Sequence, residues 1–171
     1  MAISMYQASV PGLIHTPTGV SAILEKAAEH ATQHKIEPAL LLNTRLFPDM
    51  FPLVRQVRLA CDFDQGADAR LAGIEIPKLA DTEASIEELK ARIAKTVNFL
   101  KTLKPAAIGG SEARDIEIPV ASPSLHFKGQ AYLLFFVLPN IYLHAATTSD
   151  ILWRCRRQIG KRGFIGSFEF G

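Results

Sequence analysis

His144 is the side chain in this sequence best suited to chemistry, because it stands in an apolar stretch with polar residues about one helical turn away on either side. Asn140 precedes it, and Thr147 and Thr148 follow it, so a helix would place all four side chains in one stripe. A neutral imidazole facing a bundle interior can bind a metal ion or act as an acid or base, since its ordinary pKa is about 6.5. The alternative is a structural histidine held by an ordinary hydrogen bond.

A second group of polar side chains lies in the region 50–71. Its members are Gln56, Arg58, Asp62 and Asp64. The spacing of Arg58 and Asp62 is that of an ion pair within one helix. The plain interpretation of the group is a solvated helix face. A functional interpretation requires that one of these side chains turns toward His144.

One basic cluster lies near the end of the chain, beside Trp153. It consists of Arg154, Arg156, Arg157, Lys161 and Arg162. Such a cluster can bind phosphate, but cations at a helix C-terminus are also stabilised by about 0.3–1 kcal/mol each without any ligand. The net charge of the whole chain is only +2, so we do not expect binding to nucleic acid. The role of the cluster stays open.

Four long helices are predicted to position these residues. Apolar residues recur at helical spacing over 20–31, over 50–71 with a stop near Gly73, over 81–104, and from 131 to about 156. Two features of the termini support the third helix: Ser85 and Glu88 have the spacing of a capping box, and Pro105 ends it. The last helix contains Pro139, which should kink it. The fold class is therefore all-α, an up-and-down four-helix bundle.

The remaining segments are expected to be shorter or irregular. Residues 5–14 should form a helical piece separated from 20–31, because Pro11, Gly12, Pro17 and Gly19 interrupt the pattern. A short helix is expected over 37–44, followed by an N-cap at Asp49. The region 106–128 should be a long loop with a small hairpin from the stretches 115–120 and 125–127. The tail, 158–171, should be coil.

Composition sets the class of protein. The 171 residues are 48% hydrophobic and 21% charged, which suits one soluble domain over 1–171. The longest apolar run, 131–138, is far shorter than the roughly 20 residues of a membrane span, and Met1–Pro17 lacks the basic start of a signal peptide. Cys61 and Cys155 have no metal or redox spacing, so we expect a cytoplasmic protein with two free thiols. A disulfide between them is the alternative.

Several short blocks are spread over nearly the whole chain. They are 4–11, Pro48–Leu53, Gln56-Val57, 129–134, Leu138–Asn140, His144 and 160–162. Together they resemble an uncharacterised bacterial family, a domain of unknown function placed beside the DinB- and YfiT-like helical bundles, which are described as damage-inducible metalloenzymes. The resemblance implies a bundle with a cleft between its helices, and frequently a homodimer.

The resemblance also implies a metal site. Better-known relatives hold a divalent metal with three histidines, which this chain does not supply. Asn140 and His144 occupy the i, i+4 positions where a histidine pair would be wanted, and Gln56 and Asp62 are the partners expected from the helix over 50–71. Nickel or zinc held by one imidazole, amides and a carboxylate would be bound weakly, because these metals prefer imidazole and thiolate ligands.

These observations favour a small-molecule enzyme, with a thiol-transferase-like or hydrolase-like reaction at an atypical or degenerate metal site formed by His144, Asp62, Asn140 and Gln56. The sequence does not decide whether the protein is an enzyme at all. The alternative is a non-catalytic protein that binds a small molecule or forms a homodimer, in which the apolar run 131–138 would be buried. Neither alternative involves a membrane.

Overall fold

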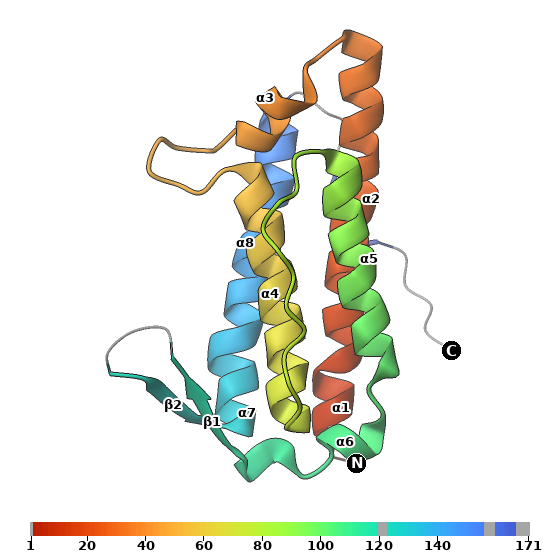
Figure 1. Ribbon diagram of the computed structural model, residues 1–171. Coiled ribbons are helices and arrows are strands. Elements are labelled where there is room, and N and C mark those ends of the chain that lie inside the picture. The colour runs from red at the N-terminus through yellow and green to blue at the C-terminus, as the bar shows by residue number, and fades with distance from the viewer. Residues whose placement is uncertain (1, 120–122, 156–159, 167–171) are drawn as a thin grey trace.

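Four long helices run side by side in the computed structural model, which describes residues 2–119, 123–155 and 160–166 (Figure 1). They are α2 (Val10–His34), α4 (Leu53–Ala72), α5 (Ile86–Thr102) and α8 (Leu138–Arg154). Helix α4 packs against α8 and α5, and α2 packs against the same two helices from the other side. The all-α bundle predicted from the sequence is confirmed.

The helices do not simply alternate in direction. Figure 1 shows α2 and α8 rising from the end where the N-terminus lies, whereas α4 and α5 both descend toward it. An extended segment, residues 74–85, returns along α4 between these two parallel helices; we call it the strap. A strictly alternating bundle would need no such crossover.

The start of the chain differs from the prediction. A short helix, α1 (Met5–Ala8), ends at Ser9, and α2 then continues without a break through Pro17. Pro11 lies in the first turn of α2, where a missing amide hydrogen costs little. Gly19 serves a close contact instead of a break, because a Cβ atom there would lie 2.5 Å from the carbonyl oxygen of Phe164.

The predicted short helix is confirmed as α3 (Pro38–Asn43). The predicted N-cap at Asp49 is wrong: α4 begins at Leu53, with Pro52 at the cap position. Residues 44–52 instead form a loop that folds back on α3, since the amide of Leu53 donates to the carbonyl of Thr44 at 2.9 Å. As expected, α4 ends at Gly73, which adopts φ 69°, a conformation that glycine reaches without strain.

Helix α5 begins at Ile86, later than the predicted start at residue 81, and Ser85 of the predicted capping box is its N-cap. The Ser85 hydroxyl accepts a hydrogen bond from the Glu88 amide at 3.1 Å, while the Glu88 carboxylate accepts one from the Ala84 amide. In the predicted capping box the Glu88 carboxylate would accept from the amide of Ser85, and here it accepts from the amide one residue earlier.

The long connection after α5 contains the predicted hairpin. It comprises α6 (Pro105–Ile108), the 3-10 turn η1 (Ser111–Ala113), β1 (Asp115–Ile118) and β2 (Leu125–Lys128). The strands are antiparallel, with Asp115 opposite Lys128 and Ile118 opposite Leu125.

The last long helix is built from three consecutive segments. A single turn, α7 (Gly129–Ala131), leads into a π-helical segment, η2 (Tyr132–Val137), and then into α8. The irregularity expected at Pro139 is this π-helical segment, since proline cannot donate the hydrogen bond to the residue four positions before it.

The region Gly129–Arg154 is, within the described residues, one helical stretch long and apolar enough to span a membrane by length and composition alone. The apolar run 131–138 is much shorter than this helical stretch, because the helix continues through Pro139. This is a weak indication, since a core helix of a bundle passes the same test, and α8 packs along α4.

The tail contains one further helix, so the prediction of coil is wrong there. Helix α9 (Lys161–Ile165) packs against α2, and the His15 ring contacts the Ile165 carbonyl oxygen. Residues 156–159 and 167–171, which the prediction also covered, lie outside the described residues.

Two apolar clusters form the core, one toward each end of the bundle. Along α4 the first cluster ends at Cys61 and the second begins at Ala67. Buried polar side chains occupy the level between them, among them Asp64, Thr96 and His144. The middle of the bundle is therefore where polar groups from different helices meet.

Candidate functional site

His144 and Gln56 lie against each other in the contact between α8 and α4. The distance from His144 Nδ1 to Gln56 Oε1 is 2.8 Å, and both residues are buried. The sequence-based expectation that His144 faces a partner on the helix over 50–71 therefore matches their placement. The ring also stacks on Phe63, with centroids 5.8 Å apart.

The hydrogen-bond network fixes which nitrogen of His144 carries the proton. Gln56 Nε2 donates to the carbonyl oxygen of Phe51 at 3.1 Å, so the Oε1 atom of the same amide faces the ring. An amide oxygen can only accept, and Nδ1 must therefore be the protonated nitrogen. Nε2 keeps its lone pair. Burial lowers the pKa of His144, which keeps the ring neutral near pH 7.

A pocket of about 240 Å³ opens beside this pair. It is lined by Asp49, Met50, Phe51, Gln56, Leu143, His144 and Thr147. The loop before α4 contributes one wall and α8 the other. Apolar walls with a few polar groups are typical of sites for small organic molecules.

Two of the four predicted ligands do not join the pair. Asn140 Nδ2 donates to the carbonyl oxygen of Phe136, in its own helix, at 2.6 Å. Asp62 accepts from Arg92 Nη2 at 2.6 Å, on the side of α4 that faces α5. Asp62 lies six positions after Gln56 in α4, about one and two-thirds helical turns. The two side chains therefore leave the helix in different directions.

The donor atoms around His144 do not fit nickel or zinc. The Gln56 amide oxygen already accepts from Nδ1, and Asn140 and Asp62 are engaged elsewhere. Within residues 2–119, 123–155 and 160–166, no three histidine, cysteine or acidic side chains are grouped as metal ligands. A single imidazole nitrogen remains, whereas zinc sites use three or four protein ligands.

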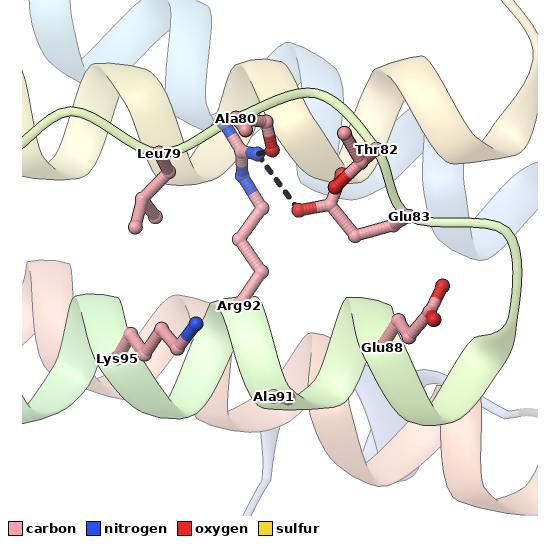
Figure 2. Close-up of a pocket in the computed structure, with 8 residues that line it drawn as sticks. All are labelled: Leu79, Ala80, Thr82, Glu83, Glu88, Ala91, Arg92 and Lys95. Atoms are coloured by element: carbon pink, nitrogen blue, oxygen red, sulfur yellow. Dashed lines mark hydrogen bonds and ion pairs between the residues drawn. The ribbon is translucent and has the colours of Figure 1, made fainter.

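Asp62 belongs to a network centred on Arg92 of α5, and Figure 2 draws the part of it formed by Arg92, Ala80 and Glu83. Arg92 is 3% exposed, and its Nη1 atom donates to the Ala80 carbonyl at 3.1 Å and to the Glu83 carboxylate at 2.9 Å. Arg58 reaches the same carboxylate from α4 at 2.7 Å. The network therefore ties the strap to both α4 and α5.

This network corrects the predicted ion pair between Arg58 and Asp62. The two residues bind different partners, Glu83 and Arg92, instead of each other. Burial favours a higher pKa for Glu83, but hydrogen bonds from both arginines outweigh it and lower the pKa. At Asp62, burial raises the pKa although Arg92 opposes the shift.

The pocket drawn in Figure 2 lies beside the Arg92 network, between the strap and α5. The guanidinium that enters it from α5 already binds a carbonyl and carboxylates. Its remaining polar groups include Lys95 and Glu88, which lie on the α5 side (Figure 2). We assign this pocket a structural role, since its central cation is committed to holding the strap.

Two buried acids were missed in the sequence interpretation. Asp64 was placed on a solvated face and Asp68 was assigned no role, yet both are 0% exposed. Their positions continue the apolar stripe of α4 formed by Val57, Cys61 and Leu71, so the helical period alone would have placed them inside. Burial, and then the charge of Asp68, raise the pKa of Asp64. Burial raises the pKa of Asp68 to about 7, although Ser9 opposes the shift.

The basic cluster is divided among different contacts. Arg154 Nη1 donates to the carbonyls of Arg45 and Leu46 at 3.2 and 2.8 Å, so it holds the loop before α4. Lys161 and Arg162 belong to α9. The other two members, Arg156 and Arg157, lie outside the described residues.

The two cysteines are free thiols, so the disulfide alternative is wrong. Cys61 lies inside the bundle, where burial raises the pKa of its thiol to about 12. A thiol with so high a pKa stays protonated and is a poor nucleophile.

The fold places the chain among the DinB-like helical bundles. A crystal structure of a DinB family member from Shewanella denitrificans superimposes with a TM-score of 0.88 and 30% sequence identity, over 97% of this chain and 94% of the other. The chain belongs to the family described as domain of unknown function DUF1993, which matches residues 5–165. The resemblance drawn from the sequence blocks is confirmed. A comparison with curated proteins gave no match.

Proposed function

We propose that this protein binds a small organic molecule in the His144 pocket and that Nε2 of His144 accepts a hydrogen bond or a proton from it. One observation carries the proposal: the hydrogen bonds from Gln56 to Phe51 and from His144 to Gln56 hold a neutral ring in one tautomer beside an apolar pocket. A neutral imidazole that is held with its Nε2 atom unprotonated is suited to act as a base.

The pocket walls indicate the chemical class of the ligand. Met50, Phe51 and Leu143 offer apolar surface, and His144 offers one acceptor nitrogen. The matching ligand has an aromatic or aliphatic body and one O–H, N–H or S–H group. Proton removal from such a group would support thiol transfer or hydrolysis without a metal ion, because the base itself generates the nucleophile.

A pair of fluorescent probes tests the proposal. 2-Naphthol carries one hydroxyl donor, and 2-methoxynaphthalene has nearly the same shape without it. We expect the wild-type protein to bind 2-naphthol roughly fivefold more tightly, since a hydrogen bond to a buried acceptor contributes about 1 kcal/mol. In His144→Phe the pocket keeps an aromatic ring, and the preference should disappear. Equal affinity of the wild-type protein for both probes would contradict the proposal.

Metal analysis separates this proposal from a metalloenzyme. Protein purified without an affinity tag should contain no stoichiometric nickel or zinc, and adding either should leave the His144 NMR signals unchanged. A bound divalent ion that His144→Ala abolishes would instead support the metal-dependent alternative.

A second proposal concerns association of two copies of the chain. Five large apolar side chains of η2 and α8 are exposed: Leu134, Phe135, Tyr142, Leu143 and Trp153. Phe135 is 78% exposed, and an apolar patch of this kind is typical of a protein interface. We propose that a homodimer buries it. Sedimentation at micromolar concentration should give a dimer that Phe135→Glu converts to a monomer; a wild-type monomer would exclude the dimer.

A further inference from the structure

Three buried oxygen-bearing side chains of α4 and its neighbour lack hydrogen-bond partners outside their own group. Both carboxylate oxygens of Asp64 are buried without a hydrogen bond, and the Asp68 carboxylate and the Ser9 hydroxyl have no partner beyond each other. All three residues are 0% exposed. Unpaired buried polar atoms are rare in folded proteins and commonly indicate a bound ion or water.

The three side chains converge from two elements. Asp64 and Asp68 lie one turn apart on α4, so they leave the same face of the helix. Ser9 joins α1 to α2, and its hydroxyl faces Asp68 closely enough to lower the pKa of that carboxyl. None of them lines the His144 pocket, so the group is separate from the site of the proposed function.

No cationic side chain of the described ranges forms an ion pair with these acids. Arg92 binds Asp62, Asp81 and Glu83. Arg70, on the next turn of α4, binds the hydroxyl of Tyr132 at 3.2 Å. Two carboxylates without a counter-charge are costly to bury, so something other than a side chain must neutralise them.

We propose that Asp64, Asp68 and Ser9 form an internal site for a divalent cation that prefers oxygen ligands, of the class of Mg²⁺, Ca²⁺ and Mn²⁺. Two carboxylates balance the charge of one such ion. The donor atoms are all oxygen, which suits these hard cations and disfavours zinc, nickel and copper. Backbone carbonyls or water complete the coordination of such ions in proteins.

Protons compete with the cation for the same oxygens. Burial raises the pKa of Asp68 to about 7 and that of Asp64 as well. The site should therefore bind a cation better in mildly alkaline than in acidic solution, because the carboxyl groups must release their protons before they can act as ligands.

Equilibrium dialysis of the full chain against MnCl₂ tests the site directly. We expect about one Mn²⁺ per chain at about pH 8, displaced by MgCl₂ or CaCl₂, and much weaker binding at about pH 5. The thermal midpoint at about pH 8 should rise when any of the three salts is added. Asp64→Asn with Asp68→Asn should abolish both effects, whereas Asp115→Asn, which removes an exposed carboxylate from β1, should leave them unchanged.

A milder variant keeps the test decisive if the double substitution does not fold. Ser9→Ala retains both carboxylates and should weaken Mn²⁺ binding roughly tenfold, by analogy with the loss of supporting groups at metal sites. Wild-type protein that binds none of the three ions at about pH 8 would overturn the proposal and show that protons alone neutralise the pair. Binding that is equal in the wild type and Ser9→Ala would likewise remove Ser9 from the site.

Discussion

Charged side chains are buried in two neighbouring places beside α4, and the groups around them differ. The Arg92 network surrounds a buried guanidinium with carboxylates and a carbonyl from α4 and the strap. Asp64 and Asp68, which follow Asp62 in α4, are more deeply buried than Asp62 and have no cationic partner. A buried charge that is neutralised by carboxylates serves the architecture, whereas one without a counter-charge indicates that a proton or ligand takes part.

The largest expected effect comes from breaking the Arg92 network. Arg92→Met should destabilise the fold by about 3–5 kcal/mol, because it leaves Glu83 buried beside only Arg58. Urea unfolding monitored by circular dichroism measures the change. The control is Lys90→Met, which removes an exposed ion pair with Glu25 and should cost about 0–1 kcal/mol. If both variants lose the same small amount of stability, the buried Arg92 network would contribute no more than an ion pair at the surface.

The next effect concerns pH and the unsatisfied pair. Since the folded pKa of Asp68 is about 7, above its unfolded value near 3.9, the folded state binds more protons in that range. The contribution of Asp68 to stability should therefore be greatest below about pH 4. It should fall by roughly 4 kcal/mol as the pH rises from there to about 7. Urea titrations in EDTA measure it.

The matched variant for this experiment is Asp68→Asn, which cannot ionise. Its stability should depend less steeply on pH between about 4 and 8 than that of the wild type. An identical slope in both proteins would mean that Asp68 does not hold its proton, and the contrast with the Arg92 network would be lost.

The smallest effect should appear at the His144–Gln56 pair, which is satisfied but uncharged. Burial lowers the pKa of His144, so stability from this group is lost as pH falls below the unfolded value of about 6.5. Gln56→Glu replaces the neutral acceptor with a carboxylate and should raise the pKa of His144, by about 1 to 3 pH units. NMR titration of the ring protons measures this shift, and Gln65→Glu is the control. A His144 pKa that stays low in Gln56→Glu would place the carboxylate away from the ring.

The sequence predicted most of the fold because helical periodicity and capping are local signals. The helices predicted over 20–31 and 81–104 and the hairpin were found in this way, although the second of these helices begins only at Ile86. The strap was not, since its position depends on Arg92 and Glu83, which are distant in sequence from the α4 residues they bind. Pro17 and Gly19 were misread as a break because their local preference is overridden by packing against α4, α8 and α9.

The candidate site was predicted in part. His144 and Gln56 were chosen for their chemistry and do meet. Asp62 was chosen for its charge without regard to the helical angle between it and Gln56. Asp64 and Asp68 were not placed in the interior, because acidic residues are rarely fully buried, although they share the spacing of the apolar residues around them.

The length of the strap is tied to the length of helix α4. Helix α4 has 20 residues, so it is about 30 Å long, and a fully extended chain needs about nine residues to travel back that distance. The strap, residues 74–85, thus has only a few residues to spare. Adding a turn to α4 would require extra residues in the return segment, so we expect insertions in one to be tolerated only with insertions in the other.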